Sequence, residues 1–217
     1  MRQAGLACAA AAFLLAASAT GQQESNPPAS AEEVASSEKW EFSASAYAYF
    51  VPHERDYALP TVTADRDWLH LEGRYNYEAL NTGSAWFGAS FRFGKTLTLE
   101  LTPMVGGVFG HTNGVAPGYH LTLGYKRFEL YSEGEYLFDT DRRADSFFYN
   151  WSELTYAPVE WLRAGLVTQR TRAYKTPLDI QRGLLVSASL ERWRFTLYLF
   201  DLGWTDPTTV FSVSLDF

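Results

Sequence analysis

Apolar and polar residues alternate along most of this chain from Trp40 to the C-terminus. Successive side chains of an extended strand point to opposite faces, so a period of two predicts strands with one apolar and one polar face. Pro60 weakens the second predicted strand because proline lacks the N–H that a ladder needs. Without that strand eleven would remain, and merging others would give ten, which is the alternative to twelve. The twelve predicted strands occupy residues 40–51, 57–64, 67–79, 84–94, 96–108, 117–125, 127–138, 146–157, 160–172, 179–191, 193–202 and 208–217.

The joins between these strands alternate in length. Tight turns are expected at Gly94, Lys126, residues 157–160 and Arg192, and longer polar joins lie between them. Short turns at one rim and longer loops at the other are typical of an up-and-down transmembrane β-barrel. The sequence therefore predicts an all-β protein whose antiparallel strands form such a barrel.

Charged residues fall on one face of the predicted strands. On the third strand His70, Glu72, Arg74 and Glu78 share a face, and Leu69, Leu71, Tyr75 and Tyr77 share the other. An arginine or lysine facing lipid at mid-membrane costs about 2–4 kcal/mol, so the charged face is expected to line the lumen. Neither face of 146–157 or of 160–172 is cleanly apolar, and their facing stays open. The pore-lining candidates are His70, Glu72, Arg74, Glu78, Arg92, Glu100, His120, Glu129, Glu133, Glu135 and Arg194.

Eight aromatic residues are expected at a single rim, because they begin the odd-numbered strands or end the even-numbered ones. Tryptophan and tyrosine gather at membrane interfaces, where one end of the ring is apolar and the other can form a hydrogen bond. A β-sandwich core would scatter them, and a water-soluble barrel would place its apolar face inside. The predicted periplasmic girdle consists of Trp40, Trp68, Phe93, Tyr125, Tyr156, Trp161, Trp193 and Phe217.

The first residues have the features of a secretory signal peptide. Arg2 precedes an apolar run from Leu6 to Ala17 that is too short to span a bilayer, and small residues follow it. We expect residues 1–19 to be the signal peptide, with cleavage after Ala19 or alternatively after Gly21. Residues 20–39 are polar and predict a disordered periplasmic lead, so the barrel comprises residues 40–217.

Composition excludes several functions. The one cysteine, Cys8, lies within the signal peptide, so the mature chain has no disulfide, thiol chemistry or cysteine metal site. The chain has 18 basic and 25 acidic residues and shows no basic stripe for nucleic acid. From the sequence we expect no metal site and no cofactor.

The last strand resembles the closing strand of bacterial outer-membrane β-barrels. Phe211, Val213, Leu215 and Phe217 share its apolar face, and the chain ends on that aromatic residue. The resemblance implies that this strand is the insertion signal read by the barrel-insertion machinery. It also implies an outer-membrane location, with membrane lipid and lipopolysaccharide as partners. The oligomeric state is left open.

Further runs resemble a family of uncharacterised small bacterial outer-membrane barrels. The runs are residues 101–110, 116–118, 128–136, 147–153 and 169–172, and the resemblance covers Trp40 to Phe217. It implies the same compartment. Because the family has no established activity, the resemblance implies no mechanism.

Two functions remain for the lumen. Eight strands leave an interior that side chains fill, sixteen leave an aqueous channel, and twelve lie between. The charges either pair and close the barrel, or form a narrow passive channel for small polar or ionic solutes. A membrane-embedded lipid-modifying enzyme is the alternative. Gly110 to Gly114 resembles the His-x-Ser-Asn-Gly run of outer-membrane phospholipase, but Thr112 replaces the serine, so we expect no enzyme and assign no catalytic residue.

Overall fold

The computed structural model describes residues 39–53, 55–141, 146–173, 179–203 and 207–217. The predicted signal peptide and most of the predicted lead lie outside these residues. The described chain is all-β. Among its residues, no helix is long and apolar enough to cross a membrane. The strands are β1 (Glu41–Phe50), β2 (Tyr57–Arg66), β3 (Leu69–Tyr75), β4 (Thr82–Ala89), β5 (Phe91–Phe93), β6 (Leu97–Gly110), β7 (Gly114–Tyr125), β8 (Phe128–Asp139), β9 (Phe147–Val159), β10 (Leu162–Ala173), β11 (Asp179–Leu190), β12 (Trp193–Phe200) and β13 (Thr208–Asp216).

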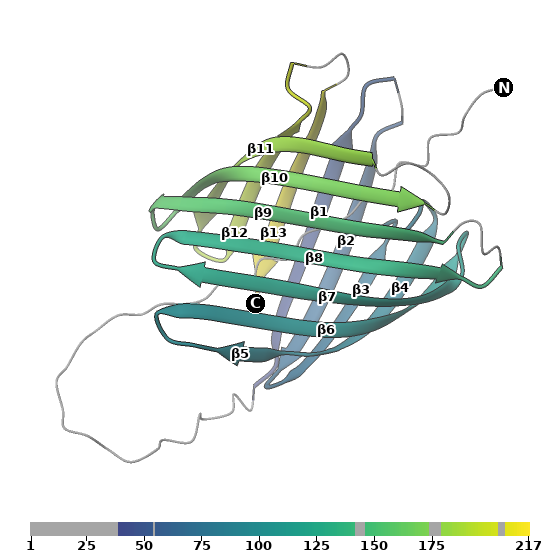
Figure 1. The fold of residues 1–217 in the computed structure, drawn as a ribbon, viewed down its shortest axis with the longest axis horizontal. Helices are drawn as coiled ribbons and strands as arrows, with labels where there is room; N and C mark the ends of the chain where they lie inside the picture. Colours follow the sequence, from purple (N-terminus) through teal and green to yellow (C-terminus); the bar gives the residue numbers. More distant parts are fainter. Residues whose placement is uncertain (1–38, 54, 142–145, 174–178, 204–206) are drawn as a thin grey trace.

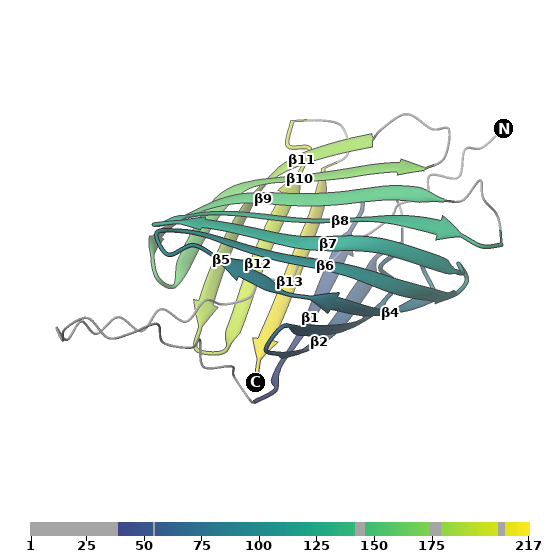
Figure 2. The ribbon, with the colours of Figure 1, turned by 60° about the horizontal axis from the view of Figure 1, so that its bottom comes forward.

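These strands form one closed antiparallel barrel. Strands adjacent in sequence pair with each other, except that β4 and β5 both pair with β6, and β1 pairs with β13 to close the barrel. Figure 1 shows β6 to β10 crossing the near wall, with β1, β2, β12 and β13 behind them. In Figure 2 the strands of the near wall run at a steep angle to those of the far wall, as expected for tilted strands. The predicted up-and-down barrel is confirmed.

The strands β4 and β5 are two parts of a single crossing. Both pair with β6, and the register is the same on either side of the break at Ser90. Pro103 of β6 lies opposite this break and has no N–H to donate, which explains why the ladder is interrupted there. The barrel therefore has twelve crossings, as predicted.

Pro60 does not abolish the second strand. It pairs with Ala46 of β1, whereas the ladder between β2 and β3 begins only at Thr61. The proline thus lies where β2 has a neighbour on one side alone, a position in which a missing N–H is tolerated. Its ring lies on the exposed outer face.

The two rims differ. The terminal rim, where β1 begins and β13 ends, also holds the tight turns that connect β2–β3, β5–β6, β7–β8 and β11–β12. Each of these turns has one residue with a positive φ, namely Asp67, Gly94, Lys126 and Glu191. The opposite rim, called here the loop rim, holds the longer joins. All eight predicted girdle aromatics lie at the terminal rim with 39–60% of their surface exposed, and their interfacial role stays a prediction.

The outer wall is strongly apolar. Large exposed side chains follow it around the barrel, including Phe87 of β4, Val105 of β6, Leu184 of β11 and Phe211 of β13. A monomeric water-soluble protein rarely exposes so large a contiguous apolar surface. This wall fits hydrocarbon and identifies the barrel as the transmembrane type.

Candidate functional site in the barrel lumen

The lumen is filled on one side by an aromatic plug. The Trp151 ring meets the Tyr198 and Phe200 rings edge to face, with centroids 5.2 and 5.4 Å apart, and all three side chains are fully buried. Apolar side chains from β1, β2, β8 and β13 pack in the same core. These side chains are buried, so they fill this side of the bore. The aromatic plug comprises Tyr47, Tyr49, Leu59, Leu137, Phe147, Tyr149, Trp151, Tyr198, Phe200 and Val210.

An ionic cluster centred on Arg74 fills the bore beside the aromatic plug. The Arg74 Nε donates to Glu72, and its Nη1 donates to Glu135 across the lumen at 3.0 Å. The guanidinium carbon lies 4.1 Å from the centroid of the Tyr77 ring and 4.4 Å from that of Trp86. Cation–π contacts of this kind are strong where water is excluded, as it is around these buried side chains. Arg74 therefore links β3 to β8 through the centre of the barrel.

Acid outnumbers base in this cluster. The buried glutamates Glu72, Glu78, Glu133 and Glu135 surround the single guanidinium of Arg74. Two phenols donate to Glu133, from Tyr77 at 2.8 Å and Tyr131 at 2.7 Å, whereas Oε1 of Glu135 has no hydrogen-bond donor. Buried carboxylates need positive partners, so this surplus demands protons or an added cation.

Two histidines adjoin the same glutamates. The Nδ1 of His70 lies 2.6 Å from Asp65 and its Nε2 lies 3.1 Å from Oε2 of Glu72. The Nε2 of His120 lies 3.7 Å from the same Glu72 oxygen and 3.6 Å from Glu133. The two imidazole rings have centroids 5.6 Å apart and are steeply inclined to one another.

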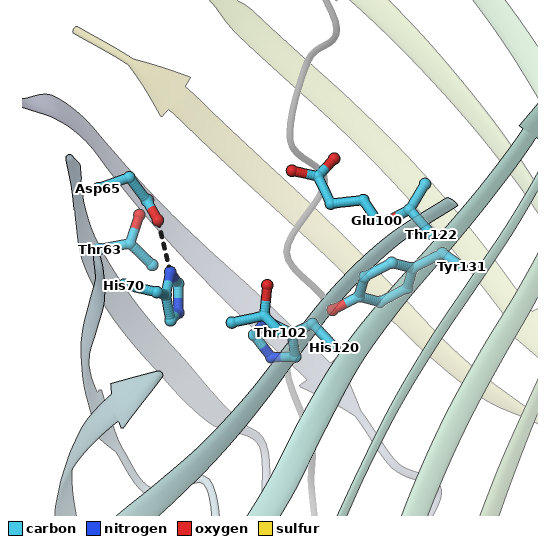
Figure 3. A pocket seen from close by; sticks show the side chains of 8 residues that line it. All are labelled: Thr63, Asp65, His70, Glu100, Thr102, His120, Thr122 and Tyr131. Carbon is cyan, nitrogen blue, oxygen red and sulfur yellow. Dashed lines mark hydrogen bonds and ion pairs between the residues drawn. The ribbon is translucent and has the colours of Figure 1, made fainter. Parts of the chain in front are cut away.

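A small pocket borders the histidines. Figure 3 shows Thr63, Asp65 and His70 on one side of it, and His120, Thr122 and Tyr131 on the other. The side chains of Asp65 and Glu100 are about a fifth exposed, so the pocket communicates with the solvated part of the lumen. Its lining is Thr63, Asp65, His70, Glu100, Thr102, His120, Thr122 and Tyr131.

Toward the terminal rim the lumen becomes a polar vestibule. Arg92 pairs with Glu100 at 2.8 Å, and Arg163 pairs with Glu129 at 2.6 Å. These side chains keep solvent contact, and that of Arg92 is 68% exposed. The vestibule comprises Arg92, Glu100, Glu129, Arg163 and Arg194.

The eleven pore-lining candidates all lie on the inner side of the barrel but in two settings. Four of them, Arg92, Glu100, Glu129 and Arg194, are in the vestibule. The structure brings the other seven into the buried cluster. Whether any of them lines a conducting path stays a prediction. The seven buried residues are His70, Glu72, Arg74, Glu78, His120, Glu133 and Glu135.

One predicted facing was wrong, and one partner was missed. The alternation predicts Tyr77 on the lipid face with Tyr75, but Tyr77 is buried in the lumen with 3% of its surface exposed. Strand β3 ends at Tyr75, and Asn76 adopts a φ of 60°, so the alternation does not continue through Tyr77. Asp65 was missed because the predicted strand stopped one residue before it. It lies directly opposite His70 in the hairpin of β2 and β3.

The facing of β9 is now settled. Trp151 and Glu153 point into the lumen, where the indole Nε1 of Trp151 and the hydroxyl of Tyr198 donate to Glu153 at 2.8 and 3.0 Å. Asn150 lies on the outer face and donates to the hydroxyls of Tyr119 and Ser132, both at 3.1 Å. This outer polar network explains why neither face looked apolar in the sequence.

The outward and inward faces of β10 also separate. Val167 and Gln169 are buried in the lumen, and Leu166 is exposed on the outer wall. Arg170 pairs in register with Asn150 and is exposed on the same outer face. The charge on β10 that obscured its pattern thus includes an arginine on the outside.

The turn that resembles a phospholipase motif has an ordinary structural role. The Gly110 amide donates to the Asn113 side chain at 3.2 Å, and the Thr112 amide donates to Thr82 at 3.2 Å. The Asn113 amide group also donates to Asp141 at 2.8 Å. His111 is exposed at this turn. These contacts account for the sequence of the turn as a loop-rim connection.

Solved structures of porins have the same architecture. The chain aligns with the KdgM porin with a TM-score of 0.57 and 10% identity, covering 81% of this chain and 99% of the porin. It aligns with the KdgM porin in complex with disordered oligogalacturonate with a TM-score of 0.58 and 9% identity, over the same shares. This chain has the outer-membrane β-barrel fold. No family model and no curated protein matches its sequence.

Proposed function

We propose that this protein is an outer-membrane β-barrel that is closed to solute flow in the conformation described above. The observation that supports this most directly is the complete burial of Trp151, Tyr198 and Phe200 inside the bore. The buried Arg74 cluster lies in the bore beside this plug. A path for solute would have to displace one of these two groups.

We also propose the orientation and the route of the chain. The signal peptide directs export, and the terminal rim with its aromatic girdle faces the periplasm. The barrel-insertion machinery recognises the C-terminal strand with Phe211 and Phe217. The outer wall contacts membrane lipid and lipopolysaccharide. In this orientation the vestibule opens to the periplasm and ends blindly at the plug.

A narrow channel is the second candidate function. The contact between Arg74 and Glu135 favours a channel, because these two side chains meet across the lumen through the guanidinium and carboxylate groups at their ends. Such contacts can separate while every strand stays paired. Small polar or ionic solutes would then pass between β3 and β8 from the vestibule.

Recordings in planar lipid bilayers separate these two candidates. We expect the folded wild-type protein to give no conductance steps, with a known twelve-strand porin as the positive control. Single-channel steps from the wild type would reject the closed barrel and favour the channel. Incubation with phospholipid and lipid A tests the enzyme alternative, and we expect both lipids to be recovered unchanged.

Export and membrane location have their own test. We expect N-terminal sequencing of the mature protein to begin at Thr20, or at Gln22 for the alternative cleavage site. The protein should remain in the outer-membrane fraction until detergent is added. Recovery in the aqueous periplasmic fraction would contradict the membrane location.

A further inference from the structure

The lumen holds a cluster of metal-ligand atoms contributed by β3 and β7. We propose that His70, Glu72 and His120 form a binding site for a divalent transition-metal ion, with Zn²⁺ as the test ion. Their ligand atoms all lie within 4.8 Å of one another. Zinc bonds of about 2.0–2.2 Å place ligand atoms roughly 3–4 Å apart, so small side-chain shifts complete the set. The inference does not depend on whether the barrel conducts.

The hydrogen bond that the Nδ1–H of His70 donates to Asp65 prepares His70 for this role. Because Asp65 holds Nδ1 at 2.6 Å, the lone pair of a neutral His70 is on Nε2, which faces Glu72. Histidines that bind metals typically donate the other ring N–H to a carboxylate in this way. Without a cation or an added proton, Nε2 and the Glu72 oxygen would face each other as two acceptors at 3.1 Å. A metal ion between them removes that conflict.

The surrounding charge favours a cation at this point. Glu133 lies 3.6 Å from Nε2 of His120, and its carboxylate can balance the charge of a bound cation. Arg74 occupies one oxygen of Glu72 and leaves the other directed toward the histidines. The Arg74 Nη2 lies 3.4 Å from His120, but Glu135 and the rings of Tyr77 and Trp86 hold the guanidinium on its own side.

The pocket beside the histidines provides access. Its lining combines threonine hydroxyls with the carboxylates of Asp65 and Glu100, which reach toward the vestibule. A cation therefore meets acidic and hydroxyl oxygens before it reaches the imidazoles. The cavity of about 20 Å³ is large enough for one water molecule, which could complete the coordination of a bound ion. Imidazole and carboxylate ligands with a water fit zinc and similar transition metals better than calcium or magnesium.

The sequence did not indicate this site, and the reason is topological. His70 and Glu72 share a face of β3, but His120 lies on β7 and Glu133 on β8. No spacing motif links these strands. Only the closure of the barrel brings their side chains together across the lumen.

The test uses the full mature protein in detergent, freed of metal by a chelator and without a histidine tag. We expect isothermal titration and elemental analysis to show one Zn²⁺ per barrel. We also expect Co²⁺ to give the visible absorption of a four-coordinate histidine–carboxylate site. Zinc should raise the thermal unfolding temperature of the wild type, since a ligand that binds only the folded state stabilises it.

Four variants locate the ion. His70→Gln and His120→Gln should each abolish stoichiometric binding and the Co²⁺ spectrum. Asp65→Asn should weaken zinc affinity about 10–100-fold while the stoichiometry stays at one, because Asp65 positions His70 without binding the ion. His111→Ala removes an exposed histidine outside the cluster and should bind zinc as the wild type does.

Some results would overturn the proposal. Absence of zinc binding to the folded wild type would favour a His70 protonated on both nitrogens between Asp65 and Glu72. Unchanged affinity in folded His70→Gln would place the metal elsewhere, as would loss of binding in His111→Ala. If the glutamine variants fail to fold, the wild-type Co²⁺ spectrum and the Asp65→Asn affinity still decide the question.

Discussion

The two halves of the lumen are built from the same alternating strands but differ in what fills them. Next to the terminal rim, inward positions carry the Arg92–Glu100 and Arg163–Glu129 ion pairs, which keep solvent contact. Farther in, inward positions carry tryptophan, tyrosine, phenylalanine and the Arg74 cluster, and water is excluded. Strand number alone therefore does not determine whether a twelve-strand barrel is open. The size and the pairing of the inward side chains determine it.

Removal of the central guanidinium should have the largest effect on this difference. Arg74→Ala leaves Glu72 and Glu135 buried without their cation, and breaking a buried ion pair costs about 3–5 kcal/mol. We expect a value near the upper end because the two aromatic contacts are lost as well. Urea unfolding in detergent micelles measures this. Arg92→Ala is the control, since the Arg92 side chain is 68% exposed. An equal loss of stability in both variants would contradict the comparison.

Truncation of the aromatic plug should come next. Trp151→Ala removes a fully buried indole, and a change from tryptophan to alanine in a core costs about 3–5 kcal/mol. The space left beside Tyr198 and Phe200 should also admit water, so we expect conductance steps in planar bilayers that the wild type lacks. Trp161→Ala removes an exposed indole at the terminal rim. It should leave the stability nearly unchanged and should give no conductance steps.

A smaller change sharpens the contrast between the tight interior and the free outer wall. A Cβ at Gly106 would overlap the indole of Trp86, whereas a Cβ at Gly107 would meet no atom within 4 Å. Overpacking of a core costs about 1–3 kcal/mol, so Gly106→Ala should destabilise the barrel by that amount. Gly107→Ala is the matched control on the same strand. Similar unfolding midpoints for the two variants would show that the packing around Trp86 is loose.

The smallest effect is expected in the vestibule. Arg163 and Glu129 are 29% and 17% exposed, and solvated ion pairs contribute about 0–1 kcal/mol. A double-mutant cycle of Arg163→Ala and Glu129→Ala measures their coupling. A coupling energy as large as the loss of stability in Arg74→Ala would mean that the vestibule excludes water as well as the Arg74 cluster does.

Particular residues show how far the sequence could be used. The alternation along the third strand placed His70, Glu72 and Arg74 inside, because a period of two assigns each side chain to a face. It could not place Tyr77, since the strand ends at Tyr75 and the left-handed Asn76 changes the direction of the chain. It also left Trp151 and Asn150 ambiguous. The outer hydrogen bonds of Asn150 to Tyr119 and Ser132 involve three different strands, which a single-strand pattern cannot represent.

The sequence by itself determined the strands, their antiparallel order, the apolar outer wall and the aromatic rim. These follow from local rules, because side-chain alternation and turn length act between residues close along the chain. Only the tertiary structure decided that the lumen is filled and that Arg74 meets Glu135. The same is true of the approach of His120 to His70. Those contacts join residues far apart in sequence, and they depend on the height and tilt at which each strand enters the closed barrel.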